Sequence, residues 1–325
     1  MLNQIKAQVP PTLNGARFDI AAATMFNTLS RKKIKTIIDR GGAFLNKKRI
    51  ALAGKLVSSG DVIELFWDEA RPLGGSDVSS LPVGIIAEFE DYVVVNKPAG
   101  LPSQATLSST NDTVIHALKV QYPDKYSSME LQLVHRLDKE TSGVMILAKN
   151  KKAQQNLEKL FQERKIQKTY HAISFGIPAQ KGGQLDWPIR RDNSRTNAYV
   201  AVISQSKSRG ASSHSKDIKS ARTRYEVLKT FSRLNASFIE CKPETGRTHQ
   251  IRVHLQALGV PLFGDKTYSN NVIGHPCNQW ATRHMLHASS ISWIEIDGRT
   301  VAFEAPFPDD FRACLNRLEK EGSQS

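Results

Sequence analysis

One aspartate in this 325-residue chain stands where proteins commonly hold a reactive group. Asp138 lies in a polar stretch, residues 135–143, between two short apolar runs at 131–134 and 144–148. Short branched runs of this kind predict buried strands, so the polar stretch is expected to be a loop on a rigid core. A carboxylate there can attack a carbon or remove a proton. Taken alone, Asp138 is more ordinarily the cap of a turn, with Thr141 as a loop hydroxyl.

A second polar stretch, residues 245–255, contains a cation that suits such a carboxylate. It is expected to enter a helix with an apolar face at Ile251, Leu255 and Leu258, ended by Gly259. A carboxylate in a closed pocket loses its charge unless a cation compensates for its desolvation. The planar fork of Arg247 can bind a carboxylate through two hydrogen bonds. Arg247 is therefore a candidate partner of Asp138, a role that the resemblance given below implies; the alternative is a surface or phosphate-contacting arginine.

The histidines and cysteines do not have the spacing of a metal site. His249 and His254 are five residues apart, His284 and His287 are three apart, and His135 stands alone. No cysteine or paired carboxylate lies near them, and neither spacing matches a known zinc motif. The three cysteines are widely spaced and odd in number, which favours reduced thiols in the cytoplasm. We expect no metal.

The charge of the chain predicts a polyanionic partner. It has 45 Lys and Arg against 31 Asp and Glu, a net charge of +14, while its 40% hydrophobic content is that of a soluble globular protein. No apolar run approaches the length of a membrane span, and the first residues show no apolar signal core, so nucleic acid is favoured over a membrane. The basic residues gather near the N-terminus, where the expected nucleic-acid contacts are Arg31, Lys32, Lys33, Lys35, Lys47, Lys48 and Arg49. A solvated helix face can also be basic without binding anything.

The elements that position these residues are predicted from periodicity and turn signals, and they indicate an α+β fold. Residues 1–13 look like a loose tail, 14–70 form a small domain, 71–82 a linker by composition, and 83–325 a second domain. The small domain is expected to hold a helix from Arg17, a helix capped by Ser30, a hairpin at 44–50 and a strand at 62–67. The second is expected to hold strands around 90–91, helices near 114–118 and 153–161, a strand at 168–176, a mobile basic loop at 204–220 and a strand-like end around 285–296.

Four ordered motifs resemble those of the RluA-type RNA pseudouridine synthases. They are His135–Gly143, Thr245–Leu255, the Gly264-Asp265 and Tyr268 pattern, and Arg283–Ala288; Val95–Leu101 also resembles the family. Many members carry a His-Pro shortly after that last phrase, whereas this chain has Pro102-Ser103, which bears on substrate choice rather than on chemistry. The resemblance implies a catalytic domain around a long mixed, mainly antiparallel sheet, with a central cleft between the loop of Asp138 and the helix of Arg247.

The resemblance also implies roles for individual residues and a reaction without a cofactor. The family moves the sugar bond of uridine from a ring nitrogen to a ring carbon, with the catalytic aspartate at the Asp138 position; the catalytic set is Asp138, Tyr170 and Arg247. A base inside folded RNA must leave its stack before it can react. Tyr170 is expected to stack on the flipped uracil and Leu286 to form the opposite wall, while Arg136 fills the vacated place. His135 and Thr141 are the remaining expected substrate contacts.

The first domain resembles the S4-like RNA-binding domains that precede the catalytic domain in this family. That resemblance makes ribosomal RNA of the large subunit the expected target, with transfer RNA as the alternative, and the chain is expected to act as a monomer. Two rivals remain: an RNA-binding assembly factor that has lost catalysis, and a glycosylase that releases free uracil. Retention of Asp138, Tyr170 and Arg247 together argues against the first rival, and free uracil among the products would identify the second.

Overall fold

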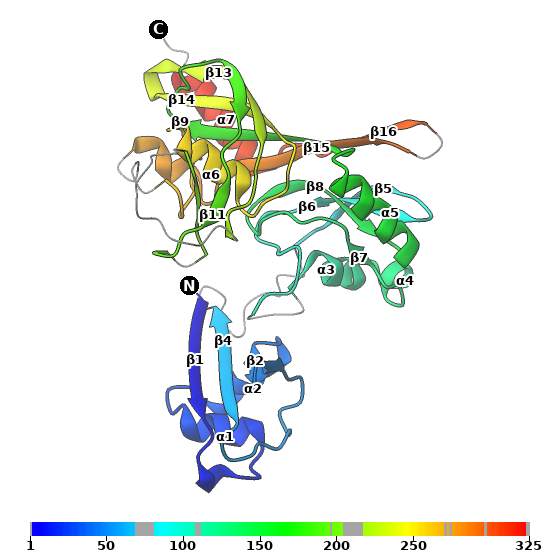
Figure 1. The fold of residues 1–325 in the computed structure, drawn as a ribbon, viewed down its shortest axis with the longest axis vertical. Coiled ribbons are helices and arrows are strands. Elements are labelled where there is room, and N and C mark those ends of the chain that lie inside the picture. The colour runs from blue at the N-terminus through cyan, green and yellow to red at the C-terminus, as the bar shows by residue number, and fades with distance from the viewer. Residues whose placement is uncertain are drawn as a thin grey trace. The chain divides into compact units, whose positions relative to one another are not determined.

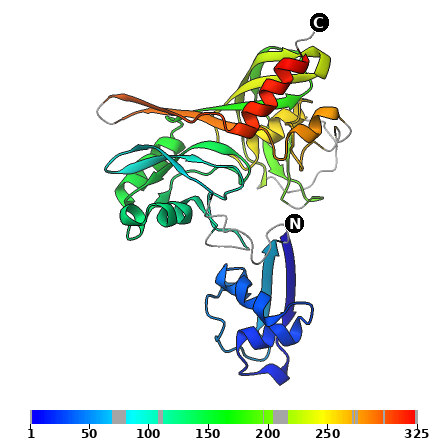
Figure 2. The same cartoon turned by 180° about the vertical axis from the view of Figure 1, so that it is seen from behind.

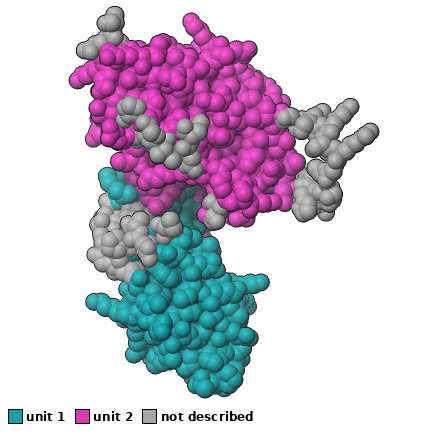
Figure 3. Space-filling view, turned by 90° about the vertical axis from the view of Figure 1, so that its left-hand side faces the viewer, with its two compact units in different colours: residues 1–83, 101–129 teal, residues 84–100, 130–325 magenta. Residues whose placement is uncertain are grey.

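The computed structural model describes residues 2–68, 81–107, 112–195, 197–203, 217–269, 272, 275–295 and 298–322. The chain divides into two compact units, residues 1–83 with 101–129, and residues 84–100 with 130–325 (Figure 3). Most of the predicted linker at 71–82 and most of the predicted loop at 204–220 lie outside the described residues.

The first unit is built on a four-stranded antiparallel sheet in the order β1-β4-β2-β3. Its elements are β1 (Leu2–Gln8), η1 (Pro11–Leu13), α1 (Phe18–Met25), α2 (Arg31–Asp39), β2 (Ala43–Leu45), β3 (Lys48–Arg49) and β4 (Val62–Asp68). The prediction of a loose tail over residues 1–13 is wrong, because β1 pairs with β4 along its whole length. Only Ile5 and Ala7 of β1 pack against the core, so its backbone pairing outweighs a sequence that is mostly polar.

The helix and hairpin predicted for the basic stretch are confirmed. The side chain of Ser30 caps α2 by accepting a hydrogen bond from the backbone N–H of Lys33 at 3.2 Å. Buried isoleucines form one stripe of α2, so most of its basic side chains are exposed. At the tip of the β2–β3 hairpin, Asn46 and Lys47 both have positive φ, 50° and 66°, as a tight two-residue turn requires.

Two of the seven basic residues predicted to meet RNA form side-chain hydrogen bonds or ion pairs within the unit, and a third, Lys33, lies over the ring of Trp67 at 5.4 Å. The guanidinium group of Arg31 lies 2.7 Å from the carboxylate of Asp19 and keeps a side-chain exposure of 58%. Arg49 donates hydrogen bonds to the carbonyl oxygens of Gly41 and Thr106. Arg49 therefore helps to hold the unit together, whereas Arg31 keeps a solvent-facing surface.

Residues 101–129, which carry α3 (Val114–Gln121) and α4 (Pro123–Tyr126), belong to the first unit rather than to the second, where the predicted boundary at residue 83 placed them. Hydrogen bonds within the unit explain this assignment. The backbone N–H of Val83 donates to Gln121 Oε1 at 2.9 Å, and Gln121 Nε2 donates to the carbonyl oxygen of Leu81 at 2.7 Å. The sequence gives no signal of such pairing between distant segments.

The second unit is organised around a ten-stranded mixed sheet (Figure 1). Its strands are β5 (Gly84–Glu88), β6 (Tyr92–Lys97), β7 (Gln132–Leu133), β8 (Ser142–Ala148), β9 (Gln167–Phe175), β10 (Gly182–Leu185), β13 (Thr223–Phe231), β14 (Ala236–Pro243), β15 (Leu286–Ile294) and β16 (Thr300–Glu304). Among the described strands, β8 and β15 form the one parallel pair. A separate hairpin joins β11 (Ile189–Arg191) to β12 (Tyr199–Ala201). The predicted α+β fold with a long, mainly antiparallel sheet is confirmed.

Helices cover both faces of this sheet. Alternate residues of β9 point to opposite faces, so Ala172 packs with Leu255 of α6 (Gln250–Ala257) and Ile173 packs with Phe311 of α7 (Asp309–Gly322). Figure 1 shows α6 on the near side, and Figure 2 shows α7 on the opposite side. Helix α5 (Lys151–Gln162) packs its buried Ala153 and Leu157 against β8. The described residues contain no helix long and apolar enough to cross a membrane.

Candidate active site

Asp138 lies in the loop that joins β7 to β8, as the apolar runs predicted. The loop is a turn in which the backbone N–H of Thr141 donates to the carbonyl oxygen of Asp138 at 3.0 Å. The Asp138 side chain is 18% exposed to solvent, so its carboxylate is largely buried but still accessible to a substrate. This is a suitable position for a group that must contact a substrate while being shielded from bulk water.

The loop is held by a segment about 145 residues further along the chain. Thr141 Oγ1 and His284 Nε2 share a hydrogen bond of 2.8 Å, and Ser142 Oγ and His287 Nδ1 share one of 2.9 Å. The guanidinium group of Arg283 donates to the carbonyl oxygen of Glu140 at 2.9 Å. These three bonds fix the backbone on the C-terminal side of Asp138.

Gly143 permits this close approach of β8 to β15. Its φ is +117°, and a Cβ atom placed on it would lie 2.1 Å from the carbonyl oxygen of Ala288. Only glycine fits both the conformation and the space. The residue that closes the predicted loop is therefore required by the pairing of the two strands.

Arg252, in the first turn of α6, is the cation that partners Asp138. Its Nη1 donates to Asp138 Oδ2 at 3.2 Å. The other side of the same guanidinium group is held by Asp265, with Nε to Oδ2 at 2.7 Å and Nη2 to Oδ1 at 2.9 Å. Arg252 and Asp265 are both buried. One arginine therefore connects two carboxylates, and Asp265 fixes its plane.

The prediction that Arg247 partners Asp138 is wrong. Arg247 precedes α6, is exposed, and its Nε donates to the carbonyl oxygen of Ser220 at 3.0 Å. The helix begins three residues later, and its first turn carries Arg252 toward Asp138 and away from solvent. Both arginines lie in the same motif, and a signal for Arg252 was available, because a charge among buried apolar helix residues requires a partner.

His249 is a second group beside Asp138. Its Nε2 lies 3.9 Å from Asp138 Oδ2, and its Nδ1 shares a hydrogen bond of 2.8 Å with the hydroxyl of Tyr268. The residue has a positive φ of 57° at the start of α6, a conformation unusual for a side chain other than glycine. Strain of this kind commonly marks a functional site.

The surroundings keep Asp138 ionised. Burial alone would raise the pKa of its carboxyl group, but His249 and Arg252 outweigh burial and hold the pKa below the ordinary value for aspartate. Arg252 carries its charge throughout the physiological pH range, so it lowers the pKa of Asp138 at every pH in that range. Burial lowers the pKa of His284 to about 3, so the imidazole that supports Thr141 is neutral.

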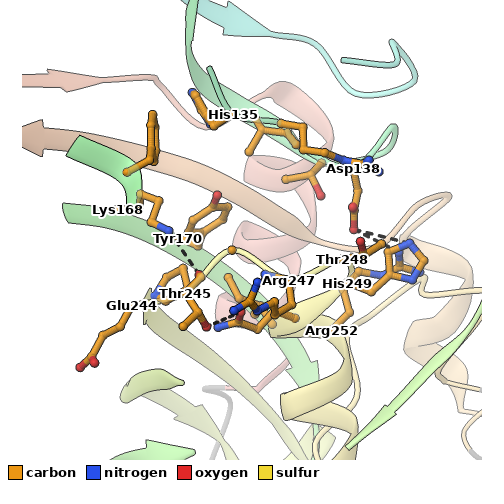
Figure 4. Close-up of a pocket in the computed structure, with 18 of the residues that line it drawn as sticks. His135, Asp138, Lys168, Tyr170, Glu244, Thr245, Arg247, Thr248, His249 and Arg252 are labelled. Carbon is orange, nitrogen blue, oxygen red and sulfur yellow. Dashed lines mark hydrogen bonds and ion pairs between the residues drawn. The ribbon is translucent and has the colours of Figure 1, made fainter. Parts of the chain in front are cut away.

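Asp138 opens onto a cavity of about 500 Å³ (Figure 4). Its walls come from the Asp138 loop, α5, β9 and the segment that leads into α6. The residues that line it include Val134, His135, Arg136, Asp138, Thr141, Phe161, Arg164, Lys168, Tyr170, Glu244, Thr245, Arg247, His249, Arg252 and Leu286. The cleft was predicted between the loop of Asp138 and the helix of Arg247, and the cavity lies there, with Arg247 in the segment before the helix.

The residues expected to hold a uracil all line this cavity. Tyr170 is half-buried on β9, and the apolar side chain of Leu286 is buried at the start of β15. Burial, with a further contribution from the negative charge of Asp138, raises the pKa of Tyr170 above its ordinary value, so its phenol is neutral. Arg136 is exposed at the edge of the loop.

His135 and Thr141 also line the cavity, but their polar atoms bind protein groups. The backbone N–H of Ile146 donates to His135 Nε2 at 2.9 Å, and the imidazole stacks on Phe161 with ring centres 4.8 Å apart. Burial lowers the pKa of His135 to about 3. Thr141 is buried and bonded to His284. Within the part of the chain that the structure describes, no three His, Cys, Asp or Glu side chains gather as metal ligands would.

Comparison with known proteins assigns the family. A model of the RNA pseudouridylate synthase family matches residues 91–257, which include the loop of Asp138, β9 and α6. The chain belongs to the RNA pseudouridine synthase family, and it is an isomerase of RNA uridine. The RluA-type family predicted from the four motifs is confirmed.

Relatives match over almost the whole chain. An uncharacterized RNA pseudouridine synthase of Aquifex aeolicus is 33% identical over 94% of both chains. The ribosomal large subunit pseudouridine synthase D of Neisseria meningitidis serogroup A is 34% identical over 98% of this chain and 83% of its own. The protein of the same name in Haemophilus influenzae is 32% identical over 98% of this chain and 95% of its own.

Two solved human structures have a similar fold. RNA pseudouridylate synthase domain containing 4 is 29% identical, with a TM-score of 0.55 over 73% of this chain and 93% of its own. RNA pseudouridylate synthase domain containing 1 is 25% identical, with a TM-score of 0.57 over 77% of this chain and 98% of its own. These matches agree with the mixed sheet described above.

Proposed function

We propose that this enzyme converts specific uridines of large-subunit ribosomal RNA to pseudouridine, with Asp138 as the group that acts on the sugar. The proposed action of Asp138 on the sugar is supported by its position beside Arg252, at the wall of a cavity large enough for a nucleoside. The choice of RNA is supported by the relatives named ribosomal large subunit pseudouridine synthase D, which align with 98% of this chain.

The reaction needs a carboxylate that is ionised and held in place. Asp138 either attacks the sugar carbon that carries the base or removes a proton from the sugar; both roles require the charged form. Arg252 keeps the carboxylate charged and turned toward the cavity. In either case the bond between the sugar and the ring nitrogen breaks, the uracil turns, and a bond to a ring carbon replaces it.

The cavity supplies surfaces for a base that has left its stack. Tyr170 offers an aromatic face and the buried Leu286 an apolar wall, which together accept a flat ring. After the new bond forms, the ring carbon must lose its proton, and the hydroxyl oxygen of Tyr170 can accept that proton while the phenol's own proton passes to solvent in the open cavity. The exposed Arg136 is available to fill the place left in the RNA, because a guanidinium plane stacks in the manner of a base.

We assign RNA binding to the basic residues of the first unit, in the manner of an S4-like domain. Lys32, Lys35, Lys47 and Lys48 are exposed on α2 and on the β2–β3 hairpin. Contacts from such residues go to phosphates and set affinity rather than chemistry. We further propose that the enzyme works as a monomer in the cytoplasm, where ribosomal RNA is made, and that it uses no cofactor.

Pseudouridine mapping of total RNA tests this proposal. A strain that lacks the gene is compared with the same strain carrying the wild-type protein or Asp138→Asn. The proposal predicts that one or a few large-subunit sites disappear on deletion and return only with the wild-type protein. Sites lost from transfer RNA instead would replace the proposed target. No lost site, or full restoration by Asp138→Asn, would reject the chemical assignment.

A further inference from the structure

Lys168 lies on the cavity wall beside Tyr170 and is not used by the proposed mechanism. The two residues are separated by one position on β9, so their side chains point to the same face of the strand. Both line the cavity of Asp138. In Figure 4 the lysine nitrogen lies near Tyr170, on the side of that ring away from Asp138.

The ammonium group of Lys168 is only weakly used by the protein. It donates to the carbonyl oxygen of Thr245 at 3.3 Å, which is long for such a bond. No carboxylate of the described residues lies within ion-pair distance of it, although Lys165, three residues earlier, pairs with Glu163 at 2.7 Å. An ammonium group has three donors, so Lys168 has donors to spare for a bound molecule.

Keeping this cation in a cavity wall is unfavourable unless something compensates for it. Burial lowers the pKa of Lys168 to about 8, so the amine is still mainly protonated at neutral pH. A partly desolvated cation without a carboxylate partner costs stability in the free protein. It also interacts strongly with any negative charge that forms beside it, because the cavity screens less than water does.

The reaction produces such a charge. When the bond between the sugar and the uracil nitrogen breaks, its electron pair stays with the uracil. The negative charge is delocalised onto the two carbonyl oxygens of the base. A uracil stacked on Tyr170, with its sugar beside Asp138, has the edge opposite the sugar facing Lys168. We propose that Lys168 is a further catalytic residue, which donates a hydrogen bond to a uracil oxygen and stabilises the detached uracil while it turns. This inference rests on the proposed use of Asp138 and its cavity.

Other cations at the cavity are less suited to this task. Arg136, Arg164 and Arg247 are exposed, so solvent screens them. Arg252 is committed to two carboxylates. His135 is neutral, and its Nε2 already accepts a hydrogen bond from the backbone. Among the described lysines and arginines that line the cavity, Lys168 is therefore the one that is both shielded and able to donate to the base.

The first test is the single-turnover rate of Lys168→Met on a synthetic RNA that spans the uridine mapped as above. Methionine keeps most of the stem and removes the charge. Loss of a donor to a developing negative charge slows the chemical step by roughly 100-fold, while RNA affinity stays within a few-fold. Lys165→Met is the matched control, since Lys165 is exposed and outside the cavity, and it should react at the wild-type rate. A Lys168→Met rate within about three-fold of wild type would overturn the inference.

The second test separates a contact with the base from mere support of the Thr245 backbone. The same RNA is made with 2-thiouridine or 4-thiouridine at the target, because sulfur accepts hydrogen bonds more weakly than oxygen. At one of the two positions, sulfur should slow the wild-type enzyme about ten-fold more than it slows Lys168→Met. Equal slowing of both enzymes at both positions would show that Lys168 only supports the loop. Lys168→Leu, which also removes the donor, serves in the same comparison if Lys168→Met melts at a lower temperature than wild type.

The two proposals fail in different ways. Wild type and Asp138→Asn are run on the unmodified RNA in the same experiment. If the wild type forms no pseudouridine, the proposed function fails, and the Lys168 inference fails with it. If the wild type is active and Asp138→Asn is inactive, any failure of the Lys168 predictions overturns the Lys168 inference alone.

Discussion

Arg252→Lys is the sharpest test of the pair at the centre of the site. The guanidinium group uses three nitrogens, one for Asp138 and two for Asp265. A lysine has one nitrogen and cannot bind both carboxylates in this geometry. The Asp265 side chain is 1% exposed and that of Asp138 is 18% exposed. Because the more buried carboxylate suffers more without a cation, the lysine should stay with Asp265 and leave Asp138 without its partner.

The size of the effect follows from the bond that is lost. A hydrogen bond between charged groups contributes about 1.5–3 kcal/mol, and about 1.4 kcal/mol corresponds to a factor of ten in rate. Arg252→Lys should therefore lower the single-turnover rate by roughly 10- to 100-fold. Arg252 also holds the pKa of Asp138 below its ordinary value. Its loss raises that pKa, so the acid side of the rate profile should move to higher pH in the variant.

The assay measures rate and affinity on one RNA, with Arg247→Lys as the matched control. Arg247 is exposed and does not touch Asp138 in the structure, so its replacement should leave the rate unchanged and affect binding at most. A thermal melt of each variant checks that the fold survives. If Arg247→Lys loses the rate while Arg252→Lys keeps it, the pairing described here is wrong, and the guanidinium group that serves Asp138 is Arg247 after all.

Three further predictions concern the loop and the first unit. Asp138→Asn should retain less than about 1% of the single-turnover rate with RNA affinity within a few-fold; higher residual turnover would exclude an essential role for the carboxylate. Gly143→Ala should destabilise the protein by more than about 4 kcal/mol, because its Cβ would lie 2.1 Å from the Ala288 oxygen; a denaturant titration that shows no shift would contradict the strand pairing. Joint replacement of Lys47 and Lys48 by Gln should reduce the slope of log affinity against log salt by up to about 2 and leave the rate of bound RNA unchanged; an unaltered slope would show that the hairpin does not touch RNA.

The parts of the fold with strong local signals were predictable. Strand β8 is a continuous apolar run after a glycine, and α6 has an apolar face that ends at Gly259, whose φ is +87°. The hairpin at Lys47 and the cap at Ser30 likewise depend on neighbouring residues. Such signals act over a few positions, so the sequence alone is enough to interpret them.

The parts that depend on distant partners were not predictable. The position of Arg252 among apolar helix residues indicates that it has a partner, but not that the partner is Asp265, which lies 13 residues further along the chain. Strand β1 is mostly polar and forms because β4 is beside it.

Helix α7 was not predicted, although Phe311, Cys314 and Leu318 have helical spacing.

The bonds between the Asp138 loop and β15 also determine when the protein becomes an enzyme during its own synthesis. A nascent chain that ends after α6 already contains Asp138, Tyr170 and Arg252, but it lacks the histidines and the strand that fix the loop. The groups proposed to act in catalysis are therefore present without being positioned. Activity can begin only after β15 has left the ribosome and inserted between β8 and β9.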